Sequence, residues 1–391
     1  MSRTKELLVV AGEASGDLHG ARLVSELRRL VPGLVTFGLG GDELEAAGLE
    51  AVAHSSEVAV VGITEVLRLL PRIKQVFAAL LSEVDRRRPD AAVLIDFPDF
   101  NLRLARELEK RGLRVIYYIS PQVWAWRKGR VRTIAKRVDR MLVLFPFEVD
   151  FYRRHGVEVV HVGHPLVDEV PQLPQAWDRL DEGGEPEGPF RVALLPGSRL
   201  GEVEALLPAM LQAVRRLAAE LPIAVSLIKA PTVPRELLEE QVELSGLPVR
   251  IVSEDRFGAI ADSHLALCAS GTATLEVGLL GTPMIVLYRL GFWTYSLARA
   301  LVRLPSISLV NLVLGRQVVP ELLQGNANPE RIAAEAERVL LEDDVRAAMR
   351  KGLAELRGRL GEGGASGRAA REVAAVLEGL EGLAKIQESP A

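Results

Sequence analysis

Two aspartates stand where an apolar segment in the first half of the chain ends. Asp96 directly follows the apolar run 91–95 and stands two residues before a proline, and Asp99 comes three residues after Asp96. A carboxylate at the end of a buried strand can act as a general base for a substrate hydroxyl. For Asp99 the favoured explanation is a cap of the next helix, because aspartate is common at that position. We therefore expect Asp96 to carry proton-transfer chemistry.

The loop 11–20, after the first apolar run, has the composition of an anion-binding turn. Its glycines allow a tight turn, and N–H groups at the start of the following helix can receive an anion. An ordinary helix cap by Ser15 or Asp17 is the alternative explanation of the same residues.

Two loops of the second half predict a diphosphate site. In the loop 195–204, the planar guanidinium of Arg199 can hold two phosphate oxygens. The turn 269–272 ends a strand in small residues and begins a helix, whose free N–H groups and dipole favour an anion. Glu276, about one helical turn further on, can reach a ribose diol.

The sequence argues against several other kinds of site. The loop 11–20 fits neither the dinucleotide-binding nor the P-loop glycine pattern, and the chain has no G-x-S-x-G serine elbow. Its six histidines lack metal-ligand spacing, so we expect no metal site. The single cysteine, Cys268, is interpreted as a small buried residue of a strand in a reducing compartment.

Aromatic and basic residues of the first half suggest a lipid or anion contact. Trp124 and Trp126 precede the segment 127–140, which has seven Lys or Arg and one Asp. A solvated helix face and an anionic substrate or lipid headgroup explain this run about equally. The apolar segments 58–63, 67–76 and 291–297 are candidate membrane or acyl-chain contacts, with a core-facing helix as the alternative.

Short apolar runs alternate with amphipathic segments along the chain, which indicates βαβ units and parallel sheets. The predicted strands are 7–11, 91–95, 115–119, 141–145 and 157–162 in the first half, and 191–195, 224–228, 249–252, 265–268 and 284–287 in the second. We expect an α/β fold with two Rossmann-like, doubly wound domains, a cleft between them and a helical C-terminus. Ligands of such sheets bind beyond the carboxyl ends of the strands.

The expected domains are 1–168 and 190–345. A stretch rich in Pro, Gly and acidic residues, 169–189, predicts the linker between them, and we expect the helices of 346–391 to pack back on the first domain. A length of 391 residues is consistent with two domains, and a net charge of −4 gives no basic footprint for nucleic acid. No segment approaches the roughly 20 apolar residues of a membrane span, so we expect a cytoplasmic protein that can touch a membrane surface.

Taken together, these loops resemble the lipid-A-disaccharide synthases, inverting glycosyltransferases of family 19 with the two-domain GT-B fold. Eight motifs in family order carry the resemblance: A-G-E-A-S-G-D (11–17), V-G-I-T-E-V-L (61–67), I-D-F-P-D-F-N (95–101), S-P-Q-V-W-A-W-R (120–127), V-G-H-P-L (162–166), L-P-G-S-R (195–199), A-S-G-T-A-T-L-E (269–276) and P-E-L-L-Q (320–324). Any one of them is weak, but eight in order over residues 7–325 are highly specific.

The resemblance implies a reaction. UDP-2,3-diacylglucosamine gives its sugar to 2,3-diacylglucosamine 1-phosphate, with a β-1,6-linked disaccharide 1-phosphate and UDP as products. It implies an acceptor and lipid domain at 1–168, a UDP-sugar domain at 190–345, and a protein bound peripherally to the inner membrane, with a homodimer left open. Neither a cofactor nor a nucleic-acid partner is implied.

The resemblance also implies roles for particular residues. Asp96 matches the family's proposed base, Glu13 lies in its first loop, and the sequence leaves open which of the two takes the proton. Arg199 and Asn311 match residues implicated in activity. The nucleotide-sugar grip corresponds to Ser270, Gly271, Thr272 and Glu276. The other expected substrate contacts are Ser15, Gly16, Asp99, Asn101, Trp124, Ser198 and Gln324.

Two hypotheses compete with this interpretation. One is another GT-B nucleotide-sugar enzyme, such as a UDP-N-acetylglucosamine epimerase or a soluble glycosyltransferase. The other is a non-catalytic sensor of nucleotide sugars.

Overall fold

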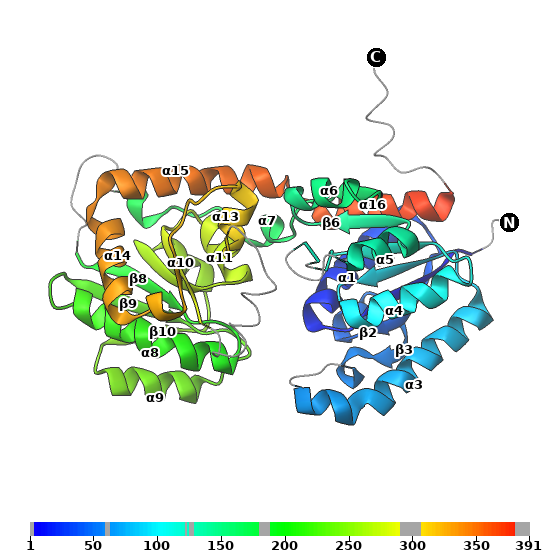
Figure 1. Ribbon diagram of the computed structural model, residues 1–391, viewed down its shortest axis with the longest axis horizontal. Coiled ribbons are helices and arrows are strands. Elements are labelled where there is room, and N and C mark those ends of the chain that lie inside the picture. Colours follow the sequence, from blue (N-terminus) through cyan, green and yellow to red (C-terminus); the bar gives the residue numbers. More distant parts are fainter. Residues whose placement is uncertain are drawn as a thin grey trace, which may run out of the picture. The chain divides into compact units, whose positions relative to one another are not determined.

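The protein forms two compact units in a computed structural model (Figure 1). The structure describes residues 4–58, 63–121, 123–124, 129–179, 188–289 and 306–379, with backbone only for 63–68. The first unit is Met1–Pro165 together with Glu362–Ala391, and the second is Leu166–Gly361. Each unit has one all-parallel sheet with helices on both faces, which confirms the expected fold class.

The first unit has a seven-stranded sheet in the order β3-β2-β1-β4-β5-β6-β7. Its strands are β1 (Glu6–Ala11), β2 (Val35–Gly40), β3 (Glu50–His54), β4 (Ala91–Ile95), β5 (Val115–Tyr118), β6 (Arg140–Val143) and β7 (Val159–His161). Its helices are α1 (Ala14–Leu30), α2 (Asp42–Ala46), the 3-10 turn η1 (Ser55–Glu57), α3 (Ile63–Arg87), α4 (Pro98–Glu109), α5 (Arg130–Arg137), α6 (Pro146–Arg153) and α16 (Ala365–Glu378).

The second unit has a six-stranded sheet in the order β10-β9-β8-β11-β12-β13. Its strands are β8 (Phe190–Leu195), β9 (Ile223–Ile228), β10 (Val249–Val252), β11 (Leu265–Ala269), β12 (Met284–Tyr288) and β13 (Glu321–Leu323). Its helical elements are α7 (Leu166–Glu169), η2 (Ala176–Arg179), α8 (Leu200–Leu217), α9 (Arg235–Ser245), α10 (Arg256–Ala261), α11 (Thr272–Leu279), α13 (Leu309–Leu314), η3 (Gln324–Asn326), α14 (Pro329–Leu341) and α15 (Asp343–Leu360).

Strand β2 was not predicted, because two glycines interrupt its apolar pattern. One of them, Gly38, has a φ of +148°, and a Cβ there would lie 1.9 Å from the carbonyl oxygen of Val9. The register of β2 against β3 also shifts between Gly38 and Leu39. Glycine therefore lets β2 approach β1 at a point where any side chain would collide with the backbone.

Alternate side chains of the central strand β1 enter two different cores. Leu8 and Val10 pack in a cluster that includes side chains of α3, α4, α5 and α6. Leu7 and Val9 pack in the other, together with side chains of α1 and α16. Because both faces of the sheet are covered, its strands are apolar throughout rather than alternating.

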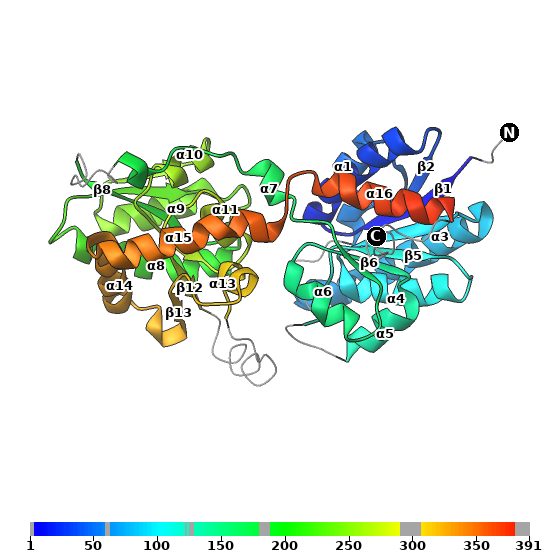
Figure 2. The same ribbon diagram turned by 90° about the horizontal axis from the view of Figure 1, so that it is seen from above.

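The last helix of the chain that the structure describes, α16, belongs to the first unit and lies beside α1 (Figure 2). A buried ion pair holds it: Arg140 of β6 contacts Glu372 of α16 at 2.8 Å, and their side chains are only 6% and 4% exposed. Arg140 also pairs with Glu158 at 2.7 Å. The preceding helix, α15, belongs to the second unit.

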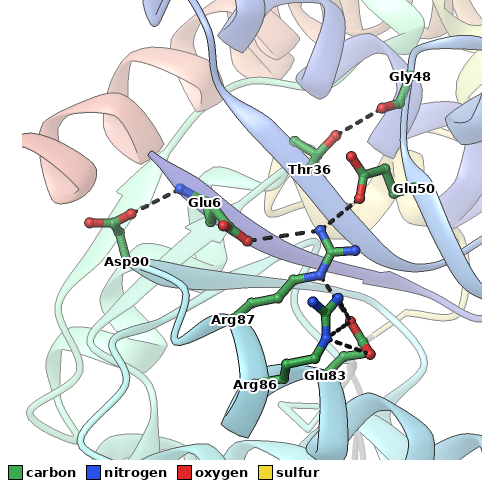
Figure 3. Close-up of polar contacts among 8 residues, drawn as sticks. All are labelled: Glu6, Thr36, Gly48, Glu50, Glu83, Arg86, Arg87 and Asp90. Atoms are coloured by element: carbon green, nitrogen blue, oxygen red, sulfur yellow. Dashed lines mark hydrogen bonds and ion pairs between the residues drawn. The ribbon is translucent and has the colours of Figure 1, made fainter. Parts of the chain in front are cut away.

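A polar network connects the end of α3 to the amino-terminal ends of strands in the first sheet (Figure 3). Arg87 donates to Glu83 at 2.9 Å and to Glu50 at 2.6 Å, and its guanidinium lies 4.6 Å from the ring centre of Phe37. Bonds from Arg86 and Arg87 lower the pKa of Glu83 to about 2. This network lies at the amino-terminal ends of the strands, whereas the loops that carry the predicted site follow their carboxyl ends.

The described part of the expected linker packs on the second unit. Trp177 is buried, its indole N–H donates to the carbonyl of His264 at 2.7 Å, and the guanidinium of Arg346 lies 3.9 Å from its ring centre. Two carbonyls further upstream, those of Val167 and Val170, accept hydrogen bonds from Arg357 of α15. Residues 180–187 lie outside the described part of the chain.

We predict that Glu372→Gln destabilises the protein by about 3 kcal/mol, because removing one partner of a buried ion pair leaves the other charge uncompensated. The value lies at the low end for such pairs, since Glu158 still contacts Arg140. Urea denaturation, monitored by circular dichroism, measures the change in the free energy of unfolding. Glu378→Gln, at the exposed end of the same helix, is the control. Equal midpoints for the two variants would contradict the prediction.

Candidate active site

The strand order of each sheet reverses at one point, between β1 and β4 in the first unit and between β8 and β11 in the second. Loops that leave two such neighbouring strands turn toward opposite faces of the sheet, and ligands bind at this position in open α/β sheets. The four loops concerned contain Glu13, Asp96, Arg199 and Gly271. The residues expected from the sequence to do chemistry therefore come to the switch points of the two sheets.

The backbone at Asp96 is strained and firmly held. Asp96 and Phe97 both have left-handed φ angles, +44° and +47°, which cost energy in residues with a Cβ. The carbonyl of Asp96 accepts hydrogen bonds from the Tyr117 hydroxyl at 2.6 Å and from the Asn101 amide at 2.8 Å, and its N–H donates to the carbonyl of Tyr118 at 3.0 Å. These bonds fix the direction in which the side chain leaves the main chain.

The environment of Asp96 makes its carboxyl group more basic than usual. Burial, followed by the negative charge of Glu13, raises the pKa of Asp96 to about 6, against a hydrogen bond from the N–H of Phe97 that lowers it. A carboxylate with a pKa close to the working pH combines a deprotonated form with a useful driving force for accepting a proton. The half-buried Asp96 has the electrostatics of a general base.

Glu13 begins α1 as its N-cap residue and is exposed. The neighbouring Gly12 lies under the ring of Phe97, since a Cβ on it would be 2.3 Å from a ring carbon. Gly16 lies against the end of β4, where a Cβ would be 3.6 Å from the Ile95 side chain. The loop after β1 and the loop after β4 are thus in direct contact.

The expectation that Ser15 or Asp17 caps α1 is wrong. Both lie inside the helix, and Ser15 is exposed in its first turn. The buried carboxylate of Asp17 instead accepts hydrogen bonds from the N–H groups of Gly41, Glu43 and Leu44, at 2.6, 3.1 and 3.2 Å. It caps the next helix, α2, because those N–H groups have no partner within that helix.

The two other polar residues of the β4–α4 loop have different surroundings. Asp99 is exposed in the first turn of α4 and forms an ion pair with Arg130 of α5, and the N-cap of α4 is Phe97. Asn101 is fully buried, and its amide nitrogen donates to the carbonyls of Ile95 and Asp96. In this structure Asn101 holds the backbone of Asp96 and does not face solvent, so a direct substrate contact does not fit its position.

Trp124 is likewise packed within the first unit. Its indole N–H donates to Glu148 at 3.2 Å, and its ring meets that of Phe147 edge-on at 4.9 Å. Burial raises the pKa of Glu148 to about 7, against bonds from Phe145, Ser120 and Trp124 that lower it. Sequence reasoning missed Glu148, since a glutamate in the first turn of a helix carries no signal of burial.

The loop after β8 presents its arginine to solvent. Arg199 is the N-cap residue of α8, and its side chain is 82% exposed. The carboxylate of Glu202 accepts from the N–H of Ser198 at 3.2 Å and from the guanidinium of Arg199 at 2.9 Å. The carbonyl of Ser198 accepts from Thr232 at 2.6 Å, which ties this loop to the segment after β9.

The turn after β11 leaves the start of α11 open. Gly271 is the N-cap, with a φ of +149°, and apart from its chain neighbours no atom of the described residues lies within 4 Å of where its Cβ would be. Thr272 is exposed, while the hydroxyl of Ser270 donates to the carbonyl of Ile307 at 3.2 Å. An anion can approach the N–H groups of this first turn closely because the glycine has no side chain.

Glu276 lies one turn into α11 and is half-buried. Burial raises its pKa, the nearby Arg256 lowers it and Glu169 raises it further. Arg256 of α10 contacts it at 3.0 Å. One oxygen of the carboxylate therefore has a cationic partner within the second unit.

Asn311 is also a buried internal residue. Its side chain accepts from the N–H groups of Val318 and Val319 at 2.7 and 3.0 Å, and donates to Glu321 at 2.8 Å. Glu321 in turn accepts from the N–H groups of Ile307 and Ser308. Asn311 thus orders the segment that contacts Ser270.

Gln324 follows β13 with a left-handed φ of +53°.

Several sequence-based candidates lie outside the described residues. These are Trp126, the segments 59–62 and 291–297, and the side chains of 63–68. Among the described residues, no cluster of three or more His, Cys, Asp or Glu has the arrangement of a metal site. Within the same ranges, no helix is long and apolar enough to cross a bilayer.

Comparison with solved structures identifies the class of fold. The chain is similar to MurG from Acinetobacter baumannii (TM-score 0.60, 13% identity, 94% of this chain and 98% of that one). It is also similar to the calicheamicin glycosyltransferase CalG4 (0.56, 19%, 96% and 99%) and to a UDP-GlcNAc 2-epimerase from Neisseria meningitidis (0.57, 11%, 96% and 100%). Its two parallel-sheet domains are those of the GT-B class.

Sequence comparison identifies the family within that class. Residues 7–373 match the family model described as lipid-A-disaccharide synthetase. The lipid-A-disaccharide synthase of Myxococcus xanthus is 48% identical over 96% of this chain and 99% of its own length, and that of Geobacter sulfurreducens is 43% identical over 95% and 97%. The chain belongs to the lipid-A-disaccharide synthetase family of enzymes.

We predict that Glu13→Gln lowers the pKa of Asp96 below about 6, because the charge of Glu13 contributes to raising it. Burial remains, so the pKa stays above its ordinary value. Carbon NMR of aspartate-labelled protein measures the titration, with Asp96→Asn assigning the signal. The control is Glu26→Gln, about 20 Å further along α1. An unchanged Asp96 titration in the Glu13 variant would rule out the coupling.

Proposed function

We propose that the protein is an inverting glycosyltransferase. It transfers 2,3-diacylglucosamine from UDP-2,3-diacylglucosamine to 2,3-diacylglucosamine 1-phosphate and releases UDP. Family membership supports the reaction. The observation that carries the residue assignment is the carboxylate of Asp96, held by a strained backbone at the switch point of the first sheet with a pKa of about 6.

In this proposal Asp96 activates the acceptor. Its carboxylate accepts the proton of the acceptor's 6-hydroxyl as that oxygen bonds to the anomeric carbon of the donor. Glu13 keeps the pKa of Asp96 high by its charge, and is exposed enough to orient a sugar hydroxyl. Tyr117 and Asn101 act as positioning residues, since their hydrogen bonds end on the carbonyl of Asp96.

The second unit stabilises the leaving group. As the bond between the anomeric carbon and the phosphate oxygen breaks, its electron pair stays on the diphosphate of UDP. That negative charge is met by the guanidinium of Arg199, the N–H of Ser198 and the open first turn of α11 at Gly271 and Thr272. Attack on the face opposite the leaving group converts an α-linked donor into a β-linked product.

Two residues complete the donor site in this proposal. Glu276 accepts hydrogen bonds from the ribose hydroxyls, while one oxygen of its carboxylate keeps the ion pair with Arg256. Asn311 acts through Glu321, which holds the backbone of Ile307, the residue that Ser270 contacts. Asn311 is a positioning residue in this scheme.

The test is a UDP-release assay with the two acylated glucosamine substrates. We expect Asp96→Asn to lower kcat by about 10²- to 10⁴-fold, the usual contribution of a general base, and to leave the Kd for UDP unchanged. In the wild type, kcat/KM should fall as the pH drops through about 6, where Asp96 becomes protonated. Glu107→Gln, on the helix α4 that follows Asp96, controls for loss of a carboxylate.

Each outcome of this assay decides something. Turnover of unacylated UDP-sugars without any UDP release from the acylated pair would replace the lipid substrate by a soluble one. UDP binding with no turnover at all would indicate a sensor. An Asp96→Asn variant as active as the wild type would remove Asp96 as the base.

We propose further that the protein works at the surface of the inner membrane, where acylated substrates reside. In the described part of α3, Leu70 is exposed two residues before Arg72, which pairs with Glu57, and α5 presents Arg132 and Lys136 to solvent. Basic side chains near apolar ones favour anionic lipid surfaces. A homodimer stays a hypothesis that sedimentation analysis tests.

The membrane proposal predicts that the protein co-sediments with phosphatidylglycerol-containing vesicles at low salt and is released at high salt, because screening weakens attraction between charges. Vesicles of phosphatidylcholine alone are the control. If the protein stays in the supernatant with both kinds of vesicle at low salt, acyl chains are bound within the protein only.

A further inference from the structure

The loop that is proposed to grip the donor's diphosphate already holds an anion of the protein itself. Glu202 is the third residue of α8, and its carboxylate accepts from the N–H of Ser198 at 3.2 Å. Its other oxygen accepts from the guanidinium of Arg199 at 2.9 Å. These are the same two donors that the proposed function assigns to the phosphate oxygens.

The carboxylate lies tight against the main chain of this loop. Gly197 has a φ of +122°, and a Cβ on it would lie 2.6 Å from one oxygen of Glu202 and 2.8 Å from its Cβ. The hydrogen bond from Thr232 to the carbonyl of Ser198 holds the loop from its other side. Glycine thus makes room for the glutamate side chain, and the loop is ordered around a negative charge.

A third ionisable group is affected by the charges of Glu202 and Arg199. Tyr288, at the carboxyl end of β12, has a raised pKa, mainly through burial; Glu202 adds to the shift and Arg199 opposes it. Both charges therefore act on this phenol. The strand that carries this phenol, β12, is the neighbour of β11 in the second sheet.

We propose that Glu202 is an internal competitor of the donor's diphosphate. A carboxylate and a phosphate are both anions, so they cannot share the N–H of Ser198 and the Arg199 guanidinium without strong repulsion. Binding of a nucleoside diphosphate displaces the Glu202 side chain, and the loss of its two hydrogen bonds weakens the net affinity. The return of Glu202 to the same donors favours departure of UDP after transfer.

This inference rests on the proposed donor site and adds a regulating residue to it. A different role for Glu202 predicts the opposite result. A glutamate at the third position of a helix often stabilises the helix start by bonding to backbone N–H groups. If Glu202 only kept the loop in shape for the ligand, its removal would weaken UDP binding.

The experiment is calorimetric titration of the full-length protein with UDP. We expect Glu202→Gln to lower the Kd for UDP by about fivefold to tenfold, which is the range for charged hydrogen bonds that are partly screened by solvent. Glu202→Asp keeps the charge but shortens the reach to both donors, so a smaller decrease is expected. Glu204→Gln removes one negative charge from an exposed position of the same helix. It controls for the long-range effect of that charge on UDP binding.

The outcomes separate the two proposals. An unchanged or raised Kd in the Glu202 variants, with UDP binding intact in the wild type, overturns the competition and leaves the proposed function standing. An equal decrease in Glu204→Gln also overturns it, because the effect then needs no contact with the loop. A wild-type protein that does not bind UDP overturns the donor site and this inference with it. Circular dichroism confirms that each variant is folded, and Glu202→Asp carries the test if Glu202→Gln does not fold.

Discussion

Inside a parallel sheet every peptide group finds its hydrogen-bond partner in a neighbouring strand, and this constraint determines where chemistry can occur in each unit. Most side chains of the central strands are apolar, because these strands are buried on both faces, and a polar side chain there needs a partner, as Arg140 has in Glu372. Polar side chains gather where the strands end and the chain must turn. At the switch points, between β1 and β4 and between β8 and β11, the turns leave toward opposite faces. Glu13, Asp96, Arg199 and Gly271 owe their positions to this rule.

Buried hydrogen bonds then fix the orientation of the backbone in these loops. The left-handed backbone at Asp96 persists because Tyr117 and Asn101 over-determine it from within the core. In the second unit Asn311 plays a comparable part, by filling all its hydrogen-bond capacity with Val318, Val319 and Glu321. In both cases a buried amide orders a loop whose surface is available to a ligand. Preorganisation of this kind is what an enzyme needs if its groups are to stabilise charge without rearranging.

The sequence predicted the buried strands and the loops after them, because continuous apolar runs and the residues that end them are local signals. It did not predict β2, which glycine interrupts, or the edge strands β3 and β13, most of whose side chains are partly or fully exposed and give no continuous apolar run. The family resemblance also suggested that Asn101 contacts the substrate and that Asn311 takes part in activity. Their burial depends on partners brought together by the fold, and no spacing in the chain encodes that. The same holds for Asp17, whose carboxylate caps a helix 25 residues downstream, and for the buried Glu148.

The path of α16 has a consequence for how the protein is made. The contact between Arg140 and Glu372 spans 232 residues, and the whole second unit lies between them in the chain. While a ribosome synthesises that unit, the face of the first sheet that α16 covers, with Leu23 and Val24 of α1 beside it, still lacks its last helix. Nascent chains expose such apolar surface to chaperones or to other unfinished chains. The first half of the enzyme is therefore the first to be translated and among the last to be completed.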